Sequence, residues 1–193
     1  YDPNNVNISS ENERLNRALQ SNYEMGSTFK PLTVAMGIDK NLIEKDMVFD
    51  VSKPIKNTIS DWDPCKCSLN IKEIIVKSSN IGTVRIANKI GSELLKEFYK
   101  SLGLLEKTSL ELPETRLTIP QSPKKWKSLD AATASYGHGI AVSPIHLAAA
   151  YSSLVNGGYK VSPTLVLKEK KVMDETVKKP KIQVIKNVTS RMV

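Results

Sequence analysis

Residues 27–39 read STFKPLTVAMGID. The apolar residues of this stretch are too closely spaced for a surface helix with one buried stripe, so the pattern predicts a helix buried on most sides. Pro31 fits such a helix only in the first turn, where its missing N–H costs no hydrogen bond. The helix should therefore begin near Ser27.

Ser27 and Lys30 are three residues apart at this helix start, so both side chains should lie on one face, close enough to hydrogen-bond. A serine becomes a nucleophile when a neighbouring group takes its proton, and a lysine can do so if burial lowers its pKa. The helix start also offers the Ser27 N–H to an oxyanion. The spacing alone is weak evidence, because Ser122 and Lys125 share it and a serine at a helix start is more often a cap.

The composition describes one ordinary globular core. The chain has 193 residues, 40% of them hydrophobic and 25% charged, which suffices for a single domain. Its net charge is +8, but the lysines are spread along the chain and few aromatic side chains are available to stack on bases, so we expect no nucleic-acid partner. No stretch approaches the roughly 18–20 apolar residues of a membrane span. Nothing indicates a cofactor.

Cys65 and Cys67 are the only cysteines, and they flank a single lysine. They lack the second pair of ligands that a structural zinc site needs, so we expect no metal. A disulfide between two cysteines this close in sequence should be strained. We therefore expect a turn with two free thiols.

The pattern along the chain is rich in helices and poor in strands. Capping signals and helical periodicity predict helices over residues 11–20, 27–39, 70–78, 81–90, 92–102 and 144–156. Residues 41–69 and 106–128 look irregular, and residues 159–167 and 181–185 alternate in the manner of strands. The lysine-rich segment 168–193 is expected to be a loose end or an exposed hairpin.

Two further segments can carry chemistry. Ser78 and Asn80 place a hydroxyl and an amide two residues apart in a tight turn between helices, where they can relay a proton and hold a substrate amide. Residues 68–70 share this pattern and read as a plain helix cap. Residues 135–139 read SYGHG, a turn whose glycines let backbone approach a ligand closely. His138, with no partner visible in the sequence, reads as a loop residue.

Taken together, these segments resemble a known family. Residues 23–31, YEMGSTFKP, resemble the nucleophile segment of penicillin-binding proteins, and residues 77–82, KSSNIG, resemble their second motif. The S-x-x-K signature is characteristic of that family. Residues 135–158 are similar to the stretch that follows the second motif in class B enzymes. With residues 111–114, they look most like the cell-division transpeptidase, and the elongation enzyme is second.

The resemblance implies a mechanism. Ser27 would attack the penultimate D-alanine carbonyl of a peptidoglycan stem peptide, Lys30 would accept its proton, and Ser78 with Asn80 would assist and orient the substrate. The expected substrate-binding residues are Ser79, Gly137, His138 and Gly139. The acyl group would pass to an amine of a neighbouring strand, and β-lactams would react at the same serine.

The resemblance also sets the expected fold and setting. The family's third motif, Lys-Thr-Gly, does not occur in these 193 residues, and the family's first core strands precede the point where the chain begins. We therefore expect residues 1–193 to be a partial transpeptidase domain with little or no turnover. It should be mostly α with minor β, the helical part of the penicillin-binding protein and serine β-lactamase-like α+β fold, with most of the central sheet missing.

The expected partners are stem peptides, their lipid-linked precursor, β-lactams and the membrane proteins of the division machinery. The expected location is the periplasmic face of the bacterial inner membrane, with the anchor outside this chain.

Three alternatives remain open at this point. A penicillin-sensing receptor domain of the same ancestry would signal on acylation, although the class B character of residues 135–158 argues against it. A basic interaction module would use Ser27 and Asn80 only as caps, and its binding to polyanions would depend on salt. A β-lactamase or carboxypeptidase would send the acyl group to water, but no deacylating glutamate is recognisable in a motif.

Overall fold

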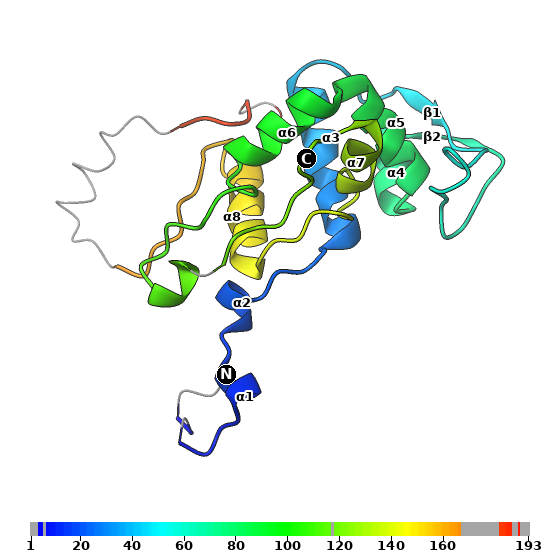
Figure 1. The fold of residues 1–193 in the computed structure, drawn as a ribbon. Coiled ribbons are helices and arrows are strands. Elements are labelled where there is room, and N and C mark those ends of the chain that lie inside the picture. Colours follow the sequence, from blue (N-terminus) through cyan, green and yellow to red (C-terminus); the bar gives the residue numbers. More distant parts are fainter. Residues whose placement is uncertain (1–3, 6, 117, 167–181, 187–188, 190–193) are drawn as a thin grey trace.

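The computed structural model describes residues 4–5, 7–116, 118–166, 182–186 and 189. Helices dominate, as Figure 1 shows. They are α1 (Glu11–Arg14), α2 (Arg17–Gln20), α3 (Lys30–Asp39), α4 (Ile71–Val76), α5 (Asn80–Ile90), α6 (Ser92–Ser101), α7 (Ser128–Ala134) and α8 (Pro144–Val155), with 3-10 turns η1 (Gly26–Phe29) and η2 (Pro113–Arg116). Strands β1 (Val48–Asp50) and β2 (Ser68–Asn70) pair antiparallel, with Phe49 opposite Leu69. The expected class, mostly α with minor β, is confirmed.

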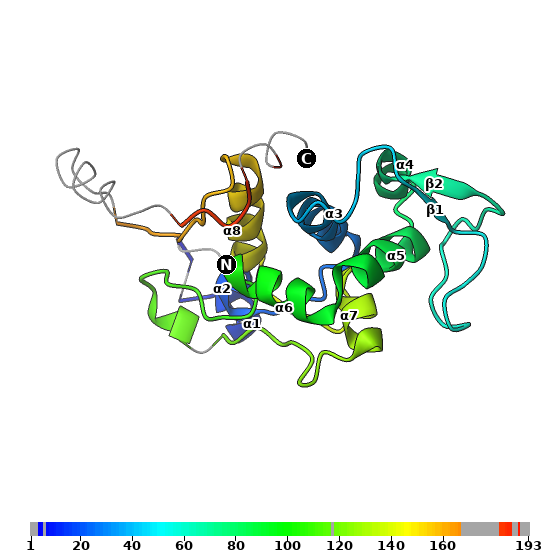
Figure 2. The ribbon, with the colours of Figure 1, turned by 90° about the horizontal axis from the view of Figure 1, so that it is seen from above.

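Helix α3 lies at the centre of the fold, between α8 on one side and α4 with α5 on the other (Figures 1 and 2). Phe29, Leu32 and Met36 are completely or almost completely buried, as the dense apolar pattern predicts. The Phe29 ring meets the edge of the Tyr99 ring of α6, with ring centroids 5.4 Å apart. The core therefore forms around the helix that residues 27–39 encode.

One hydroxyl inside this core joins three segments. Thr33 of α3 donates to the carbonyl of Ser135 over 2.7 Å, and its Oγ1 lies 2.8 Å from the Tyr99 hydroxyl. Tyr99 also donates to the carbonyl of Ala134 over 3.3 Å. Burial raises the pKa of the Tyr99 hydroxyl far above its ordinary value, so it stays neutral. These bonds fix the end of α7 against α3.

Most expected helices are confirmed, with two differences in detail. Asn70 and Glu73 form the expected capping box, each side chain accepting from the other's backbone N–H over 2.9 Å. The helix expected over 11–20 is broken at Leu15, and a second short helix starts after Asn16, whose N–H is bound by the Gln20 side chain. Helix α7 falls at the edge of the segment expected to be irregular.

The structure has a strand pair that the sequence did not predict, and it has only a bridge where two strands were expected. The β1–β2 pair lies in the segment 41–69 that looked irregular and ends one residue beyond it, at Asn70. Three-residue strands are too short to show a period of two. Within the described residues, the strands expected at 159–167 and 181–185 reduce to one bridge between Tyr159 and Gln183. Most of the lysine-rich segment 168–193 lies outside the described residues.

Cys65 and Cys67 are joined by a disulfide, so the expectation of two free thiols was wrong. Their Cα atoms are 5.2 Å apart, within the range that a disulfide spans. The chain therefore turns tightly enough at Lys66 for the two side chains to meet. The bridge lies in the β1–β2 connection.

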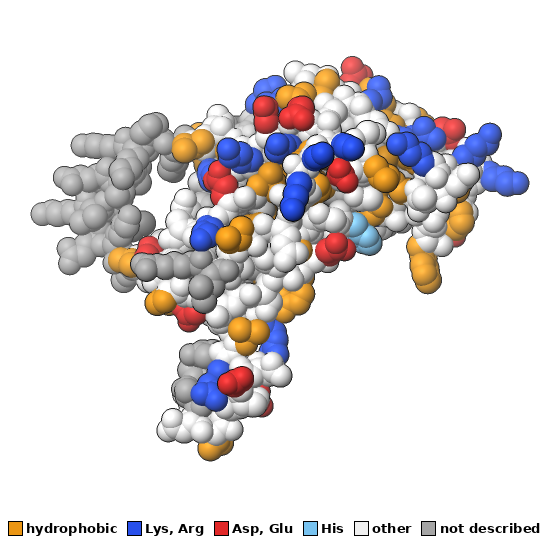
Figure 3. Space-filling view, viewed as in Figure 1, with side chains coloured by type: hydrophobic (Ala, Val, Ile, Leu, Met, Phe, Trp, Pro, Cys, Tyr) orange, Lys and Arg blue, Asp and Glu red, His pale blue; other side chains and the backbone are white. Residues whose placement is uncertain are grey.

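On the face shown in Figure 3, lysine and arginine side chains are spread over several elements, with acidic side chains among them. None of the helices in the described residues combines the length and apolar character needed to cross a bilayer.

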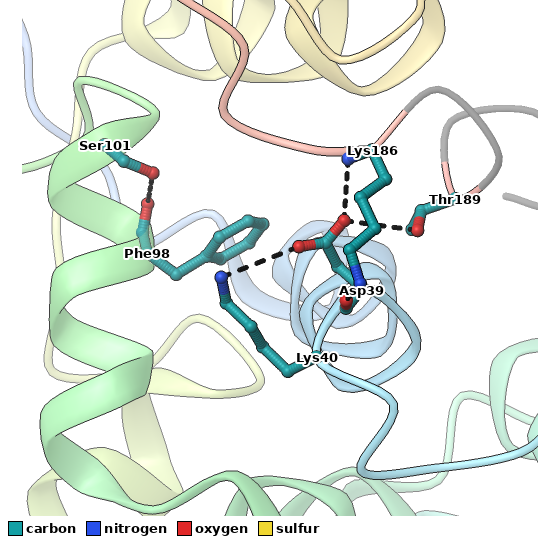
Figure 4. Close-up of polar contacts among 6 residues, drawn as sticks. All are labelled: Asp39, Lys40, Phe98, Ser101, Lys186 and Thr189. Atoms are coloured by element: carbon teal, nitrogen blue, oxygen red, sulfur yellow. Dashed lines mark hydrogen bonds and ion pairs between the residues drawn. The ribbon is translucent and has the colours of Figure 1, made fainter.

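Asp39, the last residue of α3, anchors the C-terminal segment to the core (Figure 4). Its side chain is almost completely buried, and Oδ1 accepts from the Lys186 N–H over 2.7 Å and from the Thr189 hydroxyl over 3.2 Å. The Lys186 ammonium donates to the Asp39 carbonyl over 2.6 Å. A carboxylate is unfavourable at a helix C-terminus, so these donors offset the cost of placing Asp39 there.

Replacing Asp39 by Ala should lower the free energy of unfolding by about 1–3 kcal/mol, because the buried Thr189 hydroxyl and the Lys186 N–H lose their acceptor. Amide hydrogen exchange should also accelerate at Lys186. Lys40→Ala is the matched control, because Lys40 is half exposed and 3.7 Å from the Asp39 carboxylate, and exposed ion pairs contribute about 0–1 kcal/mol. Equal effects of the two changes in urea unfolding would contradict the anchoring role.

Candidate active site

Ser27 and Lys30 lie where η1 passes into α3. Side chains three residues apart eclipse in a 3-10 turn, so the two side chains project from the same edge of the helix start. Ser27 is exposed, whereas Lys30 is only 2% exposed. The nucleophile candidate therefore faces solvent, and the candidate base lies behind it in the protein.

The turn between α4 and α5 brings Ser78 to both residues. The Lys30 ammonium donates to Ser78 Oγ over 2.9 Å and also to the Ser78 carbonyl. Ser78 Oγ donates to Ser27 Oγ over 3.0 Å. The sequence predicted a direct contact between Ser27 and Lys30, but the described hydrogen bonds connect them through Ser78.

Burial lowers the pKa of Lys30 to about 8, because desolvation penalises the charged ammonium. The negative charge of Asp61 acts in the opposite direction and keeps the pKa from falling further. At neutral pH a fraction of Lys30 is then uncharged and able to accept a proton. The arrangement therefore connects a candidate nucleophile (Ser27), a relay hydroxyl (Ser78) and an amine base (Lys30) by consecutive hydrogen bonds.

Ser79 and Asn80 follow Ser78 but take different roles. Ser79 is 1% exposed, and its Oγ accepts from the Gly82 N–H over 2.9 Å, which caps α5. The Ser79 hydroxyl is buried and caps α5, and its predicted role in substrate binding stays a prediction. Asn80 is partly exposed, and its amide nitrogen donates to the carbonyl of Ser60 over 3.0 Å.

The turn at residues 137–139 packs against η1. The Gly26 N–H donates to the Gly137 carbonyl over 3.2 Å, and a Cβ on Gly137 would lie 2.1 Å from the Gly26 carbonyl oxygen. The Gly139 N–H donates to the Glu24 carboxylate over 2.9 Å. Gly137 is thus buried against the nucleophile turn, while His138 and Gly139 are exposed, and the His138 ring lies beside Tyr136.

Three residues at the site were missed by sequence reasoning. Asp61 accepts from the Ser79 hydroxyl over 2.6 Å, and the Tyr151 hydroxyl of α8 donates to the Thr28 carbonyl over 2.6 Å. Glu24 holds the Gly139 N–H. Glu24 lies inside the recognised segment 23–31, but no local pattern marks Asp61 or Tyr151, since their partners are far away in sequence. Among the described residues, no group of three or more acidic, histidine or cysteine side chains could hold a metal ion.

Comparisons with known proteins place the chain in a family. The family model described as "Penicillin binding protein transpeptidase domain" matches residues 1–193. The chain is 41% identical over 161 residues to the "Probable peptidoglycan D,D-transpeptidase FtsI" of Caulobacter vibrioides, which covers 82% of this chain and 27% of that protein. It is 28% identical over 159 residues to the "Peptidoglycan D,D-transpeptidase FtsI" of Escherichia coli K12, with the same coverage.

Solved structures share the fold. The transpeptidase domain of penicillin-binding protein 3 from Burkholderia pseudomallei superposes with a TM-score of 0.80 at 25% identity, over 92% of this chain and 53% of that one. A peptidoglycan glycosyltransferase from Burkholderia ambifaria gives 0.79 at 27% identity, over 91% of this chain and 55% of that one. The chain spans about a quarter of the length of these two curated relatives.

Gly137→Ala should displace the nucleophile turn, because the added Cβ would overlap backbone atoms of Gly26. Gly139→Ala is the matched control: it has a similar positive φ of 71° but a nearest neighbour 3.4 Å away. Both carry left-handed strain of about 1–2 kcal/mol. We expect Gly137→Ala to lose more stability and to accelerate hydrogen exchange at Gly26; equal effects in both variants would argue against the close packing.

Proposed function

Because this chain belongs to the penicillin-binding protein transpeptidase family, we propose that it forms the acylating part of a peptidoglycan D,D-transpeptidase, with Ser27 as the nucleophile. The observation that carries the proposal is the line of hydrogen bonds from buried Lys30 through Ser78 to exposed Ser27. Relatives that carry the D,D-transpeptidase name support the reaction class.

In the first step, Ser27 Oγ attacks the carbonyl carbon of the penultimate D-alanine of a stem peptide. With Lys30 neutral, the same hydrogen bonds run in the reverse sense, from Ser27 to Ser78 and from Ser78 to the Lys30 amine. The Ser27 proton then passes to Ser78 Oγ while the Ser78 proton passes to Lys30, so the charges balance at Lys30 and the oxyanion. The first N–H groups of a helical turn lack intrahelical partners, and we assign the Ser27 N–H to the oxyanion. The partly exposed Asn80 amide is the group we assign to substrate orientation.

In the second step, the tetrahedral intermediate collapses and the terminal D-alanine leaves as its amine. The leaving nitrogen takes the proton back from Lys30 through Ser78, which leaves an acyl-Ser27 ester. An amine of a neighbouring stem peptide then attacks this ester, and Lys30 accepts the proton of that amine. The ester C–O bond breaks as the new amide forms, and the proton returns from Lys30 through Ser78 to Ser27 Oγ. A β-lactam reacts at the same serine because its strained amide mimics the D-alanyl-D-alanine unit.

The finer biological assignment rests on the relatives. By resemblance to the relatives named FtsI, we propose a role in septal wall synthesis, and we propose the periplasmic face of the inner membrane as its location. There the lipid-linked precursor and division-machinery membrane proteins are the partners we propose. Exposed His138 and Gly139, beside η1, are the residues we propose to line the substrate path.

The proposal includes a limit on turnover. In relatives the Lys-Thr-Gly motif supplies a second oxyanion donor and a cation for the substrate carboxylate, and the tripeptide does not occur in these 193 residues. Losing one oxyanion donor lowers kcat about 100–1,000-fold in other serine enzymes. We therefore propose that this chain alone turns over slowly or not at all.

Intact mass after incubation with a penicillin tests the nucleophile. We expect one adduct that disappears in Ser27→Ala and persists in Ser122→Ala, the matched control, because Ser122 starts the other S-x-x-K sequence and is also exposed. If the chain stays unlabelled, the same pair of variants is tested in a form extended at both ends. An adduct that survives Ser27→Ala, or an extended form that is never labelled, would refute the assignment.

The pH dependence of acylation tests the base. Lys30 accepts a proton only when neutral, so the rate should rise about tenfold per pH unit below the Lys30 pKa of about 8 and level off above it. Stopped-flow acylation from pH 6 to 10 measures this profile, in the chain or in the extended form. A rate that does not level off near pH 8 but keeps rising toward pH 10.5, the ordinary lysine pKa, would show that no base with the lowered pKa of Lys30 controls acylation.

A further inference from the structure

The connection between β1 and β2 (residues 51–67) reaches back to the site and contacts the three residues directly after Ser78. The Asp61 carboxylate accepts from the Ser79 hydroxyl over 2.6 Å and from the Ile81 N–H over 2.9 Å. The carbonyl of the preceding Ser60 accepts from the Asn80 amide over 3.0 Å. In Figure 1 this connection lies beside the ends of α4 and α5. Two consecutive residues of the connection thus hold three consecutive residues at the start of α5.

This contact is favourable for a carboxylate. The first N–H groups of a helix carry partial positive charge and have no intrahelical partners, so an acidic side chain there is stabilised. Asp61 uses one oxygen for the Ile81 N–H and the other for Ser79. Ser79 in turn binds the Gly82 N–H over 2.9 Å. Asp61 and Ser79 together provide acceptors for two N–H groups at the start of α5, those of Ile81 and Gly82.

The conformation of Ser78 needs this support. Its φ of +53° lies in the left-handed region, which is unfavourable for a residue with a side chain. On the α4 side, the Ser78 N–H donates to the Ile75 carbonyl over 3.1 Å and the Ser79 N–H to the Ile74 carbonyl over 2.9 Å. On the α5 side, the fixation comes from Asp61. Ser78 is therefore held between a helix end and a carboxylate.

Asp61 also acts on Lys30 by its charge. Its field raises the pKa of Lys30 and so opposes the larger effect of burial. Many other titratable side chains on the segments that meet here are exposed, so solvent screens them. They are Glu24, Lys53, Lys56, Asp63, Lys66, Lys72, Glu73, Lys77 and His138. When Lys30 takes the serine proton it becomes a cation, and a nearby carboxylate stabilises that state.

We propose that Asp61 is a positioning residue of this site: it holds Ser78 in its left-handed conformation and supplies the negative charge that stabilises protonated Lys30. Its value for catalysis rests on the function proposed above, but both physical effects exist in the free protein and are measured there. The residue acts through Ser79, Ile81 and Lys30 and does not itself touch the reacting atoms.

The test compares Asp61→Asn with Asp63→Asn, the matched control, because Asp63 is an exposed carboxylate on the same connection. The readout is the pKa of Lys30, followed by nitrogen-15 NMR titration of its side chain in the intact chain. Asp61→Asn should lower this pKa below its value of about 8, whereas Asp63→Asn should leave it unchanged. A purely structural role for Asp61 would not move the pKa in this direction while the fold is kept.

Unlike Asp61→Asn, the Asp61→Ala variant also removes the side-chain oxygens that accept from the Ser79 hydroxyl and the Ile81 N–H. We expect the same fall in the Lys30 pKa, together with faster amide exchange at Ile81 and Gly82. In a form that acylates, the Asp61→Asn rate profile should shift to lower pH, with a plateau lower by up to about tenfold per unit of pKa lost. Asp61→Glu, which keeps the charge, should restore most of the Lys30 pKa.

The two proposals fail separately. A Lys30 pKa that is equal in Asp61→Asn and Asp63→Asn, with unchanged exchange at Ile81 in Asp61→Ala, would overturn the role of Asp61 whatever the chain does with β-lactams. Suppose instead that Asp61→Asn lowers the Lys30 pKa but neither the chain nor its extended form gives an adduct at Ser27. The role of Asp61 would then stand, and the proposed function would be refuted.

Discussion

The structure depends most on the burial of one amine. Lys30 is 2% exposed, and a buried ammonium is costly unless it is hydrogen-bonded. Ser78 meets this need with both its carbonyl and its hydroxyl, which ties the α4–α5 turn to the start of α3. The left-handed Ser78 and the carboxylate of Asp61 follow from the same requirement, because the turn must present both oxygens to Lys30. Burial also lowers the Lys30 pKa, so the constraint that orders the site makes the lysine a usable base.

The nucleophile turn is held by segments that are distant in sequence. The backbone of Gly137 packs on Gly26, Tyr151 binds the Thr28 carbonyl, and Thr33 links α3 to the end of α7 through the Ser135 carbonyl. These contacts are one close backbone packing and two hydrogen bonds, so they resist small shifts of the nucleophile turn. The exposed hydroxyl of Ser27 therefore projects from a rigid base, which suits a group that must be placed accurately before reaction.

Local sequence predicted the parts of this arrangement that local physics controls. The apolar density of residues 27–39 gave the buried helix, Asn70 with Glu73 gave a capping box, and recognised motifs placed Ser27, Lys30 and Ser78 together. The relay through Ser78, the burial of Ser79 and the role of Asp61 could not be predicted, because they join residues 18 to 51 positions apart. Such contacts depend on how helices pack. The short β1–β2 pair and the disulfide in its connection likewise depend on tertiary contact and chain direction, which periodicity does not report.

The most direct test of this account is the pKa of Lys30 in the unmodified chain, measured by titrating its side-chain nitrogen by NMR from pH 6 to 11. The account requires a value of about 8, set by burial against Asp61. A value near 10.5, the ordinary lysine pKa, would mean that the amine is solvated and that the line from Lys30 through Ser78 to Ser27 does not form.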